Sequence, residues 1–147
     1  MKQLFIILIT FVLTNQIIAQ SFKLEYDHTA IPVSDLDKSS AFYGEILKLK
    51  EIRTPGDNPI LRWFDLGNNR QLHLIENNSE ILLNKGVHFA LNATDLKAFI
   101  DHLQQNNIPF EDWLGSKETV ASRPDGVKQI YIQDPDGHWI EINDASY

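Results

Sequence analysis

The sequence predicts an α+β domain that is built from two βαβββ modules, residues 24–76 and 86–143. The main observation is an internal repeat, in which the pattern His-x-Ala-[Ile/Leu]-x-x-[Ser/Thr]-Asp-Leu starts at His28 and again at His88. The offset is constant, because 88 − 28 and 95 − 35 both equal 60. Two further observations agree with it: each copy is followed by apolar residues at helical spacing, and each helix is followed by short strands between turn signals.

The elements of the first module are expected at 24–33, 48–53, 60–66 and 70–76 for the strands, with one helix after the first strand. Ser34 is the predicted N-cap of that helix, and its acidic first turn is favourable at a helix N-terminus. Gly67-Asn68-Asn69 predicts a hairpin between the last two strands.

The second module repeats this order, with strands expected at 86–93, 108–113, 127–133 and 138–143. Its helix is expected from Asp95 to about Gln105, capped by Thr94. Asp134-Pro135-Asp136-Gly137 predicts the turn between the last two strands. Residues 114–126 are expected to form a mobile, irregular loop, and residues 77–85 are a polar connection between the modules.

The first 19 residues have the pattern of a secretory signal peptide. Lys2 precedes an apolar run that is shorter than the roughly 20 residues a membrane span needs, and Ala19 offers a small residue for cleavage. The predicted mature domain, residues 20–147, is then periplasmic or secreted, and an uncleaved anchor is the alternative. The chain contains no cysteine, which excludes a lipoprotein anchor, thiolate ligands and a thiol nucleophile.

The charge of the chain argues against two classes of partner. The formal net charge is −7, and removal of Lys2 with the signal peptide makes the mature chain more acidic by one unit. An acidic domain of this kind is not expected to bind nucleic acid or, after cleavage, an anionic membrane.

Metal-capable side chains stand at matching places in the two modules. His28 and His88 lie on the two opening strands, and alignment of the closing strands pairs His73 with Glu141. Because side chains alternate along a strand, His73 and Glu141 face away from the apolar residues beside them. A polar side chain between buried apolar neighbours is costly unless it is paired or bound to a metal.

These residues carry a resemblance to the vicinal oxygen chelate superfamily, which includes glyoxalase I, bleomycin resistance proteins and extradiol dioxygenases. The resemblance covers nearly the whole mature chain, and its most specific motif is Asp134-Pro-Asp-Gly-His-Trp-Ile-Glu-Ile142. It implies that the two modules form an incomplete eight-stranded barrel, or cup, around one divalent metal ion. It also implies a ligand set of His28, His73, His88 and Glu141.

The resemblance implies a metal-dependent lyase, isomerase or dioxygenase that acts on a small oxygen-rich or dicarbonyl compound. Three imidazoles and one carboxylate suit Zn, Ni, Fe or Co better than Mg or Ca, and two histidines with one carboxylate suit Fe(II). Glu141 is the ligand that can also serve as a catalytic base. His73 departs from the Glu or Gln usual in some family members, and an exported protein meets little glutathione, so lactoylglutathione lyase activity is not expected. A binding protein that sequesters a small molecule is the alternative.

The resemblance also implies a homodimer, with each site formed either within one chain or by exchange of modules between chains. Arg62 and Arg123 are candidates for binding an anionic substrate group, and Lys117 is a weaker one. His102 and His138 are given no role at the site.

Overall fold

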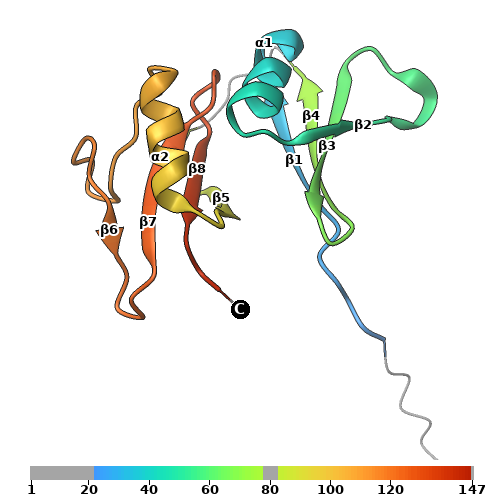
Figure 1. The fold of residues 1–147 in the computed structure, drawn as a ribbon. Coiled ribbons are helices and arrows are strands. Elements are labelled where there is room, and N and C mark those ends of the chain that lie inside the picture. Colours follow the sequence, from blue (N-terminus) through green and yellow to red (C-terminus); the bar gives the residue numbers. More distant parts are fainter. Residues whose placement is uncertain (1–21, 78–82, 147) are drawn as a thin grey trace, which may run out of the picture.

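The computed structural model describes residues 22–77 and 83–146, so the predicted signal peptide and the middle of the predicted linker lie outside the described residues. The chain forms two four-stranded sheets, each accompanied by helix (Figure 1). This arrangement confirms the two βαβββ modules expected from the repeat. Within the described residues, no helix is both long and apolar enough to cross a membrane.

The first module contains one sheet with the strand order β1-β4-β3-β2. Its outer strand β1 runs parallel to β4, and the other neighbours are antiparallel. Asn68 and Asn69 both have positive φ, at 52° and 60°, and form the predicted hairpin turn between β3 and β4. The elements are β1 (His28–Val33), α1 (Leu36–Ala41), the π-helical turn η1 (Phe42–Ile46), β2 (Lys50–Ile52), the 3₁₀ turn η2 (Pro55–Asp57), β3 (Leu61–Gly67) and β4 (Arg70–Glu76).

The second module repeats this topology, with the strand order β5-β8-β7-β6 and a parallel pairing of β5 with β8. The elements are β5 (His88–Asn92), α2 (Leu96–Gln105), β6 (Ala121–Ser122), β7 (Lys128–Gln133) and β8 (Trp139–Asn143). Equivalent strands therefore occupy equivalent places in the two sheets, as the constant offset of the sequence repeat predicts.

The helix caps lie one residue later than expected in both modules. Asp35 and Asp95, rather than Ser34 and Thr94, are the N-caps, and their carboxylates accept hydrogen bonds of 2.9 Å from the backbone N–H three residues on. A carboxylate at this position also interacts favourably with the helix dipole, so Asp is the stronger cap of each pair. The hydroxyl of Ser34 instead donates to Asp136.

The expected strand at 108–113 is not formed, and the expected irregular loop contains a strand. Glu111 makes only isolated bridges to Tyr131 and Lys117, whereas the short strand β6 pairs with the edge of β7. Gly115 and Glu118 have positive φ values of 89° and 52°, and they turn the chain between these two contacts. Residues 114–126 are therefore partly tied to the sheet.

Each sheet has one face in the hydrophobic core and one face that carries polar residues. On β4, Leu72 and Leu74 are fully buried in the core, and on β8 the core residues are Ile140 and Ile142. The alternation of side chains along a strand places His73 and Glu141 on the opposite faces. We call these opposite surfaces face 1, on the first module, and face 2, on the second.

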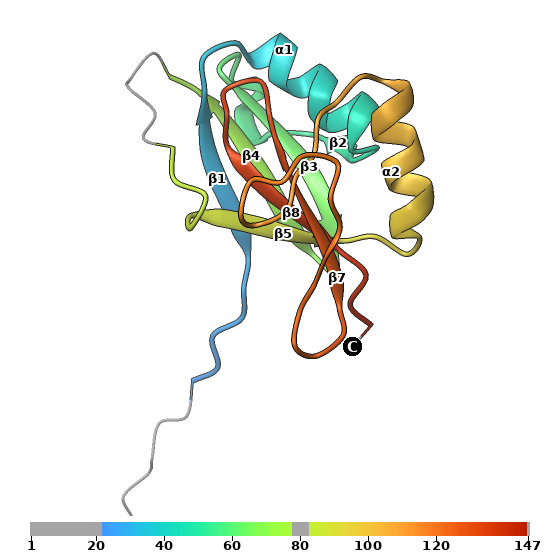
Figure 2. The same ribbon diagram turned by 90° about the vertical axis from the view of Figure 1, so that its left-hand side faces the viewer.

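The two modules contact each other through their helices and the β7–β8 turn. Helices α1 and α2 lie on the same side of the molecule (Figure 2), and His102 Nε2 lies 3.1 Å from the carbonyl oxygen of Ile46. The hydroxyl of Tyr43 donates to Asp134 at 2.8 Å, and His138 Nδ1 lies 3.0 Å from the same carboxylate oxygen. We call Tyr43, Asp134 and His138 the inter-module clamp.

The sheets are not closed into a barrel. Among residues 22–77 and 83–146 no strand of one sheet pairs with a strand of the other. An open groove of about 1580 Å³ is lined by residues of both modules, including Leu47, Leu66, Phe89 and Glu141. The curled cup that the resemblance implies is thus present as two open halves.

Candidate functional site

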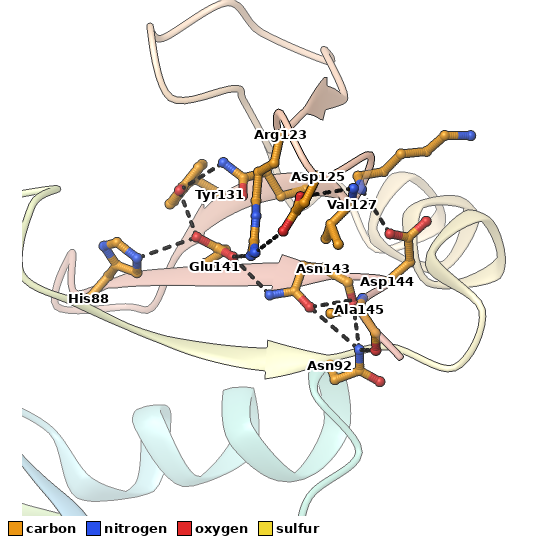
Figure 3. Close-up of polar contacts among 12 residues, drawn as sticks. His88, Asn92, Arg123, Asp125, Val127, Tyr131, Glu141, Asn143, Asp144 and Ala145 are labelled. Carbon is orange, nitrogen blue, oxygen red and sulfur yellow. Dashed lines mark hydrogen bonds and ion pairs between the residues drawn. The ribbon is translucent and has the colours of Figure 1, made fainter. Parts of the chain in front are cut away.

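Face 2 brings together the two predicted ligands of the second module. His88 is the first residue of β5, and its strand partner on β8 is Trp139, two residues before Glu141 on the same face. The Nε2 atom of His88 lies 3.4 Å from Glu141 Oε2 (Figure 3). The predicted ligand pair of this module is therefore assembled by strand register alone.

The carboxylate of Glu141 is buried and held by two neutral donors. The Tyr131 hydroxyl donates to Oε2 at 2.7 Å, and the Asn143 amide donates to Oε1 at 2.8 Å (Figure 3). Burial and the hydrogen bond to Glu141 raise the pKa of Tyr131, so its proton stays on the hydroxyl at neutral pH. Each carboxylate oxygen also has a second neighbour: Oε2 lies 3.4 Å from His88 Nε2, and Oε1 lies 3.9 Å from the Arg123 guanidinium.

The donor chemistry of this pair fits a divalent cation. His88 Nδ1 lies 2.8 Å from the carbonyl oxygen of Lys85, and a carbonyl can only accept, so Nδ1 donates this hydrogen bond and Nε2 is the ring nitrogen that faces the carboxylate. A neutral imidazole that is oriented by a backbone carbonyl is a common arrangement for a metal ligand. Two ligand atoms about 2.1 Å from one ion at a tetrahedral angle would be about 3.4 Å apart, which matches the separation in this pair.

Face 1 holds the other two predicted ligands, His28 and His73, in a stack of rings. Their ring centroids are 4.2 Å apart at an interplanar angle of 16°, and Trp63 stacks on the other side of His73 at 3.9 Å and 7°. Burial, with a smaller contribution from the charge of His28, lowers the pKa of His73. His73 is therefore neutral at pH 7, which is the state that a metal ligand requires.

The four predicted ligands form two pairs that do not meet within one chain. Nowhere in residues 22–77 and 83–146 do three or more His, Asp or Glu side chains gather as a potential metal site. Each chain thus presents two half-sites, with two imidazoles on face 1 and an imidazole with a carboxylate on face 2.

The two candidate arginines lie in different places: Arg123 is close to face 2, and Arg62 lies on the core-directed side of the first sheet. Arg123 follows β6, and its guanidinium lies 2.5 Å from Asp125 and 3.9 Å from Glu141 Oε1 (Figure 3). Arg62 does not lie on face 1, because it alternates with Trp63 and shares the core-directed side of β3 with Phe64. Its guanidinium lies 3.9 Å from Asp37 of α1 and 3.5 Å from Glu51 of β2.

The other residues considered in the sequence analysis contact parts of the fold outside faces 1 and 2. Lys117 is exposed, and its backbone pairs with Glu111. His138 belongs to the inter-module clamp, and His102 is half-buried between the modules rather than solvated.

The sequence interpretation missed the residues that orient the ligands. Asn143 could have been found, because it lies two residues after Glu141 on one strand and therefore on the same face. Tyr131 is directly opposite Glu141 in the β7–β8 pairing, but this register depends on the Asp134–Gly137 turn and is not visible in local composition. Lys85 contributes its backbone carbonyl, for which no side-chain pattern exists.

Comparisons with known proteins agree with this geometry. The family model of the Glyoxalase/Bleomycin resistance protein/Dioxygenase superfamily matches residues 25–142. The uncharacterized protein YwbC from Bacillus subtilis is 34% identical over 124 residues, which covers 79% of this chain and 94% of YwbC. Among solved structures, the oxidase ChaP-H2 has a TM-score of 0.71 at 20% identity and covers 86% of this chain and 97% of its own. The lactoylglutathione lyase from Agrobacterium tumefaciens has a TM-score of 0.60 at 25% identity, with coverages of 82% and 93%. The chain therefore belongs to the Glyoxalase/Bleomycin resistance protein/Dioxygenase superfamily.

Proposed function

We propose that this protein is a divalent-metal-dependent enzyme that acts, after export, on a small oxygen-rich or dicarbonyl compound as a lyase, isomerase or dioxygenase. His28, His73, His88 and Glu141 are the proposed ligands of one Zn, Ni, Fe or Co ion. The proposal is supported by membership of a superfamily in which such enzymes occur and by the imidazole and carboxylate donors on the two faces.

One observation carries the proposal: His88 Nε2 and Glu141 Oε2 face each other at 3.4 Å. An imidazole nitrogen and a carboxylate oxygen that face each other are donors that a divalent cation of this kind accepts. The fixed Nδ1 proton and the two donors to Glu141 keep both atoms in this orientation.

A metal ion at this place would act as a Lewis acid on neighbouring substrate oxygens. Glu141 is the proposed base for a C–H proton next to a carbonyl group. The carboxylate takes the proton, and both of its oxygens have neighbours: Oε2 faces His88 and the Tyr131 hydroxyl, and Oε1 faces the Asn143 amide and Arg123. Tyr131 and Asn143 hold the carboxylate in place while this happens.

The first test is the metal content of the purified mature protein. The wild type and a His102→Gln variant, whose histidine lies outside both faces, are expected to bind metal stoichiometrically when measured by mass spectrometry of the eluted ion. His88→Ala and Glu141→Gln are expected to lose most of that metal. A wild type without stoichiometric metal would instead support the alternative, a protein that sequesters a small molecule.

Replacement of Tyr131 by Phe is expected to weaken metal binding about tenfold, because it removes the donor that orients Glu141 Oε2. The measurement is the metal dissociation constant from competition with a chelator. Thr119→Val is the control for loss of a hydroxyl, since the Thr119 hydroxyl makes an exposed hydrogen bond to the backbone oxygen of Lys117. Equal affinities in the two variants would mean that the Tyr131 hydroxyl does not position the ligand.

Arg123 is the proposed contact for an anionic group of the substrate. With oxalate as a small probe that has neighbouring oxygens, Arg123→Ala is expected to weaken binding to the metal-loaded protein about tenfold, as for loss of one charged hydrogen bond. Arg62→Ala is the control, because its guanidinium lies between Asp37 and Glu51 on the other side of the sheet. A loss of oxalate affinity in Arg62→Ala alone would contradict this assignment.

Each complete site is proposed to form between two chains of a homodimer. Face 1 of one chain would supply two imidazoles, and face 2 of the partner would supply His88 and Glu141. The absence of a group of three metal-capable side chains in the described part of one chain supports this arrangement over a site within one chain.

A further inference from the structure

The tryptophans of this chain gather around the proposed ligands. The sequence contains three tryptophans, Trp63, Trp113 and Trp139, and none of them is among the buried core residues of the described chain. Trp63 stacks on His73 with a centroid distance of 3.9 Å and an interplanar angle of 7°. The indole therefore extends face 1 as a flat aromatic surface beside two proposed ligands.

Face 2 is aromatic as well. The rings of Trp113 and Tyr131 are 5.6 Å apart, and each lies edge-on to the His88 ring, at 6.2 Å and 5.4 Å. Trp139 shares the strand face of Glu141, and the Lys85 ammonium lies 4.4 Å from its ring centroid. The proposed ligands of both modules thus lie among planar rings.

The three tryptophan rings lie outside the core, and one of them is exposed to solvent. The core contains aliphatic residues together with Phe42, Tyr43, Phe64 and Phe110, and it lies on the opposite face of each sheet. Trp113 is 48% exposed although it is among the most apolar side chains available. An exposed aromatic surface next to a few oriented polar groups is typical of a small-molecule site.

We propose that the ligand of this site is a planar aromatic ring system, which stacks on the indoles of Trp63 and Trp113 while an oxygen-bearing substituent reaches His88 and Glu141. The inference rests on the proposed function, because it assumes that faces 1 and 2 form one small-molecule site. Aromatic rings prefer offset-stacked or edge-to-face partners, whereas a saturated ring of similar size gains only from burial. Ring recognition is therefore separable from metal binding.

A matched pair of probes tests the proposal on the full mature protein. The pair is 2-naphthoate and decahydro-2-naphthoate, which carry the same carboxylate and differ in planarity and π electrons. Binding is measured by calorimetry with metal-loaded protein and again after chelation. We expect 2-naphthoate to bind about tenfold more tightly than the saturated probe in both states, and Trp63→Leu or Trp113→Leu to lower its affinity about tenfold with unchanged metal content. The control is Phe22→Leu, since Phe22 is 83% exposed outside the sheets, and this change is expected to have no effect.

Equal or tighter binding of decahydro-2-naphthoate would overturn the proposal and indicate a merely apolar surface. Unchanged 2-naphthoate affinity in both tryptophan variants would overturn it as well. Loss of the dimer by light scattering in Trp113→Leu would assign this ring to the subunit contact and would also contradict the proposal. A protein that binds no metal but still prefers 2-naphthoate would refute the proposed metalloenzyme and support ring recognition, so the two failures are distinguishable.

Discussion

Two variants that each fail to bind metal are expected to recover half of the metal sites when they are combined in one dimer. One variant carries His28→Ala and His73→Ala, and the other carries His88→Ala and Glu141→Gln. Each homodimer lacks one half of every proposed site and is expected to bind no stoichiometric metal. In a mixed dimer with exchanged modules, one site receives both damaged halves and the other receives both intact halves.

The measurement needs the two variants with different affinity tags, refolded or expressed together and purified through both tags. The expected content is one ion per two chains, against two in the wild type. Sites formed within one chain would leave the mixed dimer empty, because every chain carries a damaged half. A mixture of the two homodimers without subunit exchange is the control, and it is expected to hold no metal.

Asp134→Asn is expected to destabilise the fold by about 3 kcal/mol, which would be the largest effect of a single substitution outside the metal site. The Asp134 side chain is fully buried. Its carboxylate accepts hydrogen bonds from Tyr43, from His138 and from the backbone N–H groups of Asp136 and His138, at 2.8–3.0 Å. An amide cannot satisfy these donors on both of its atoms. The measurement is the free energy of unfolding in urea, and the surface variant Asp101→Asn is the control, with unchanged stability expected.

The pH dependence of the same variant gives an independent check. Burial raises the pKa of the Asp134 carboxyl, but the hydrogen bonds and charge of His138 and the hydrogen bond from Tyr43 outweigh it, so the folded pKa is lower than usual. A lowered carboxyl pKa contributes stability above the unfolded value of about 3.9, and this contribution is lost as the pH falls through the folded value. The wild type is therefore expected to lose stability more steeply than Asp134→Asn as the pH falls below about 4. Parallel pH profiles would mean that the carboxylate is not charged in the folded protein.

The faces of the strands followed from the sequence because alternation is a local property of the chain. His73 between Leu72 and Leu74, and Glu141 between Ile140 and Ile142, were assigned to the correct faces by this rule alone. The same rule places Arg62 with Phe64, on the face of β3 that packs in the core, so this candidate for substrate binding lies away from face 1.

Features that depend on distant residues were not predictable in this way. Tyr43 and Asp134 are 91 positions apart, and no periodicity links an aromatic helix residue to a turn in the other module. The placement of the two pairs in separate half-sites also depends on how the modules pack, and local patterns specify each module without fixing that packing. The strand expected at 108–113 failed for a related reason, since residues 121–122 pair with Lys128 and Gln129 of β7 and leave a single bridge from Glu111 to Tyr131.

Because the two ligand pairs of one chain are separate, the proposed metal binding depends on the protein concentration. If every ion is shared by two chains, loading follows the square of the free subunit concentration, and dilution alone can empty the sites without any loss of folded protein. Metal binding and dimer formation are coupled in both directions. The ion stabilises the dimer by the same free energy by which dimer formation stabilises ion binding. If the protein is exported as its N-terminal sequence predicts, dilution into the surrounding medium would empty the sites, and a compartment that holds the subunits together would keep them filled.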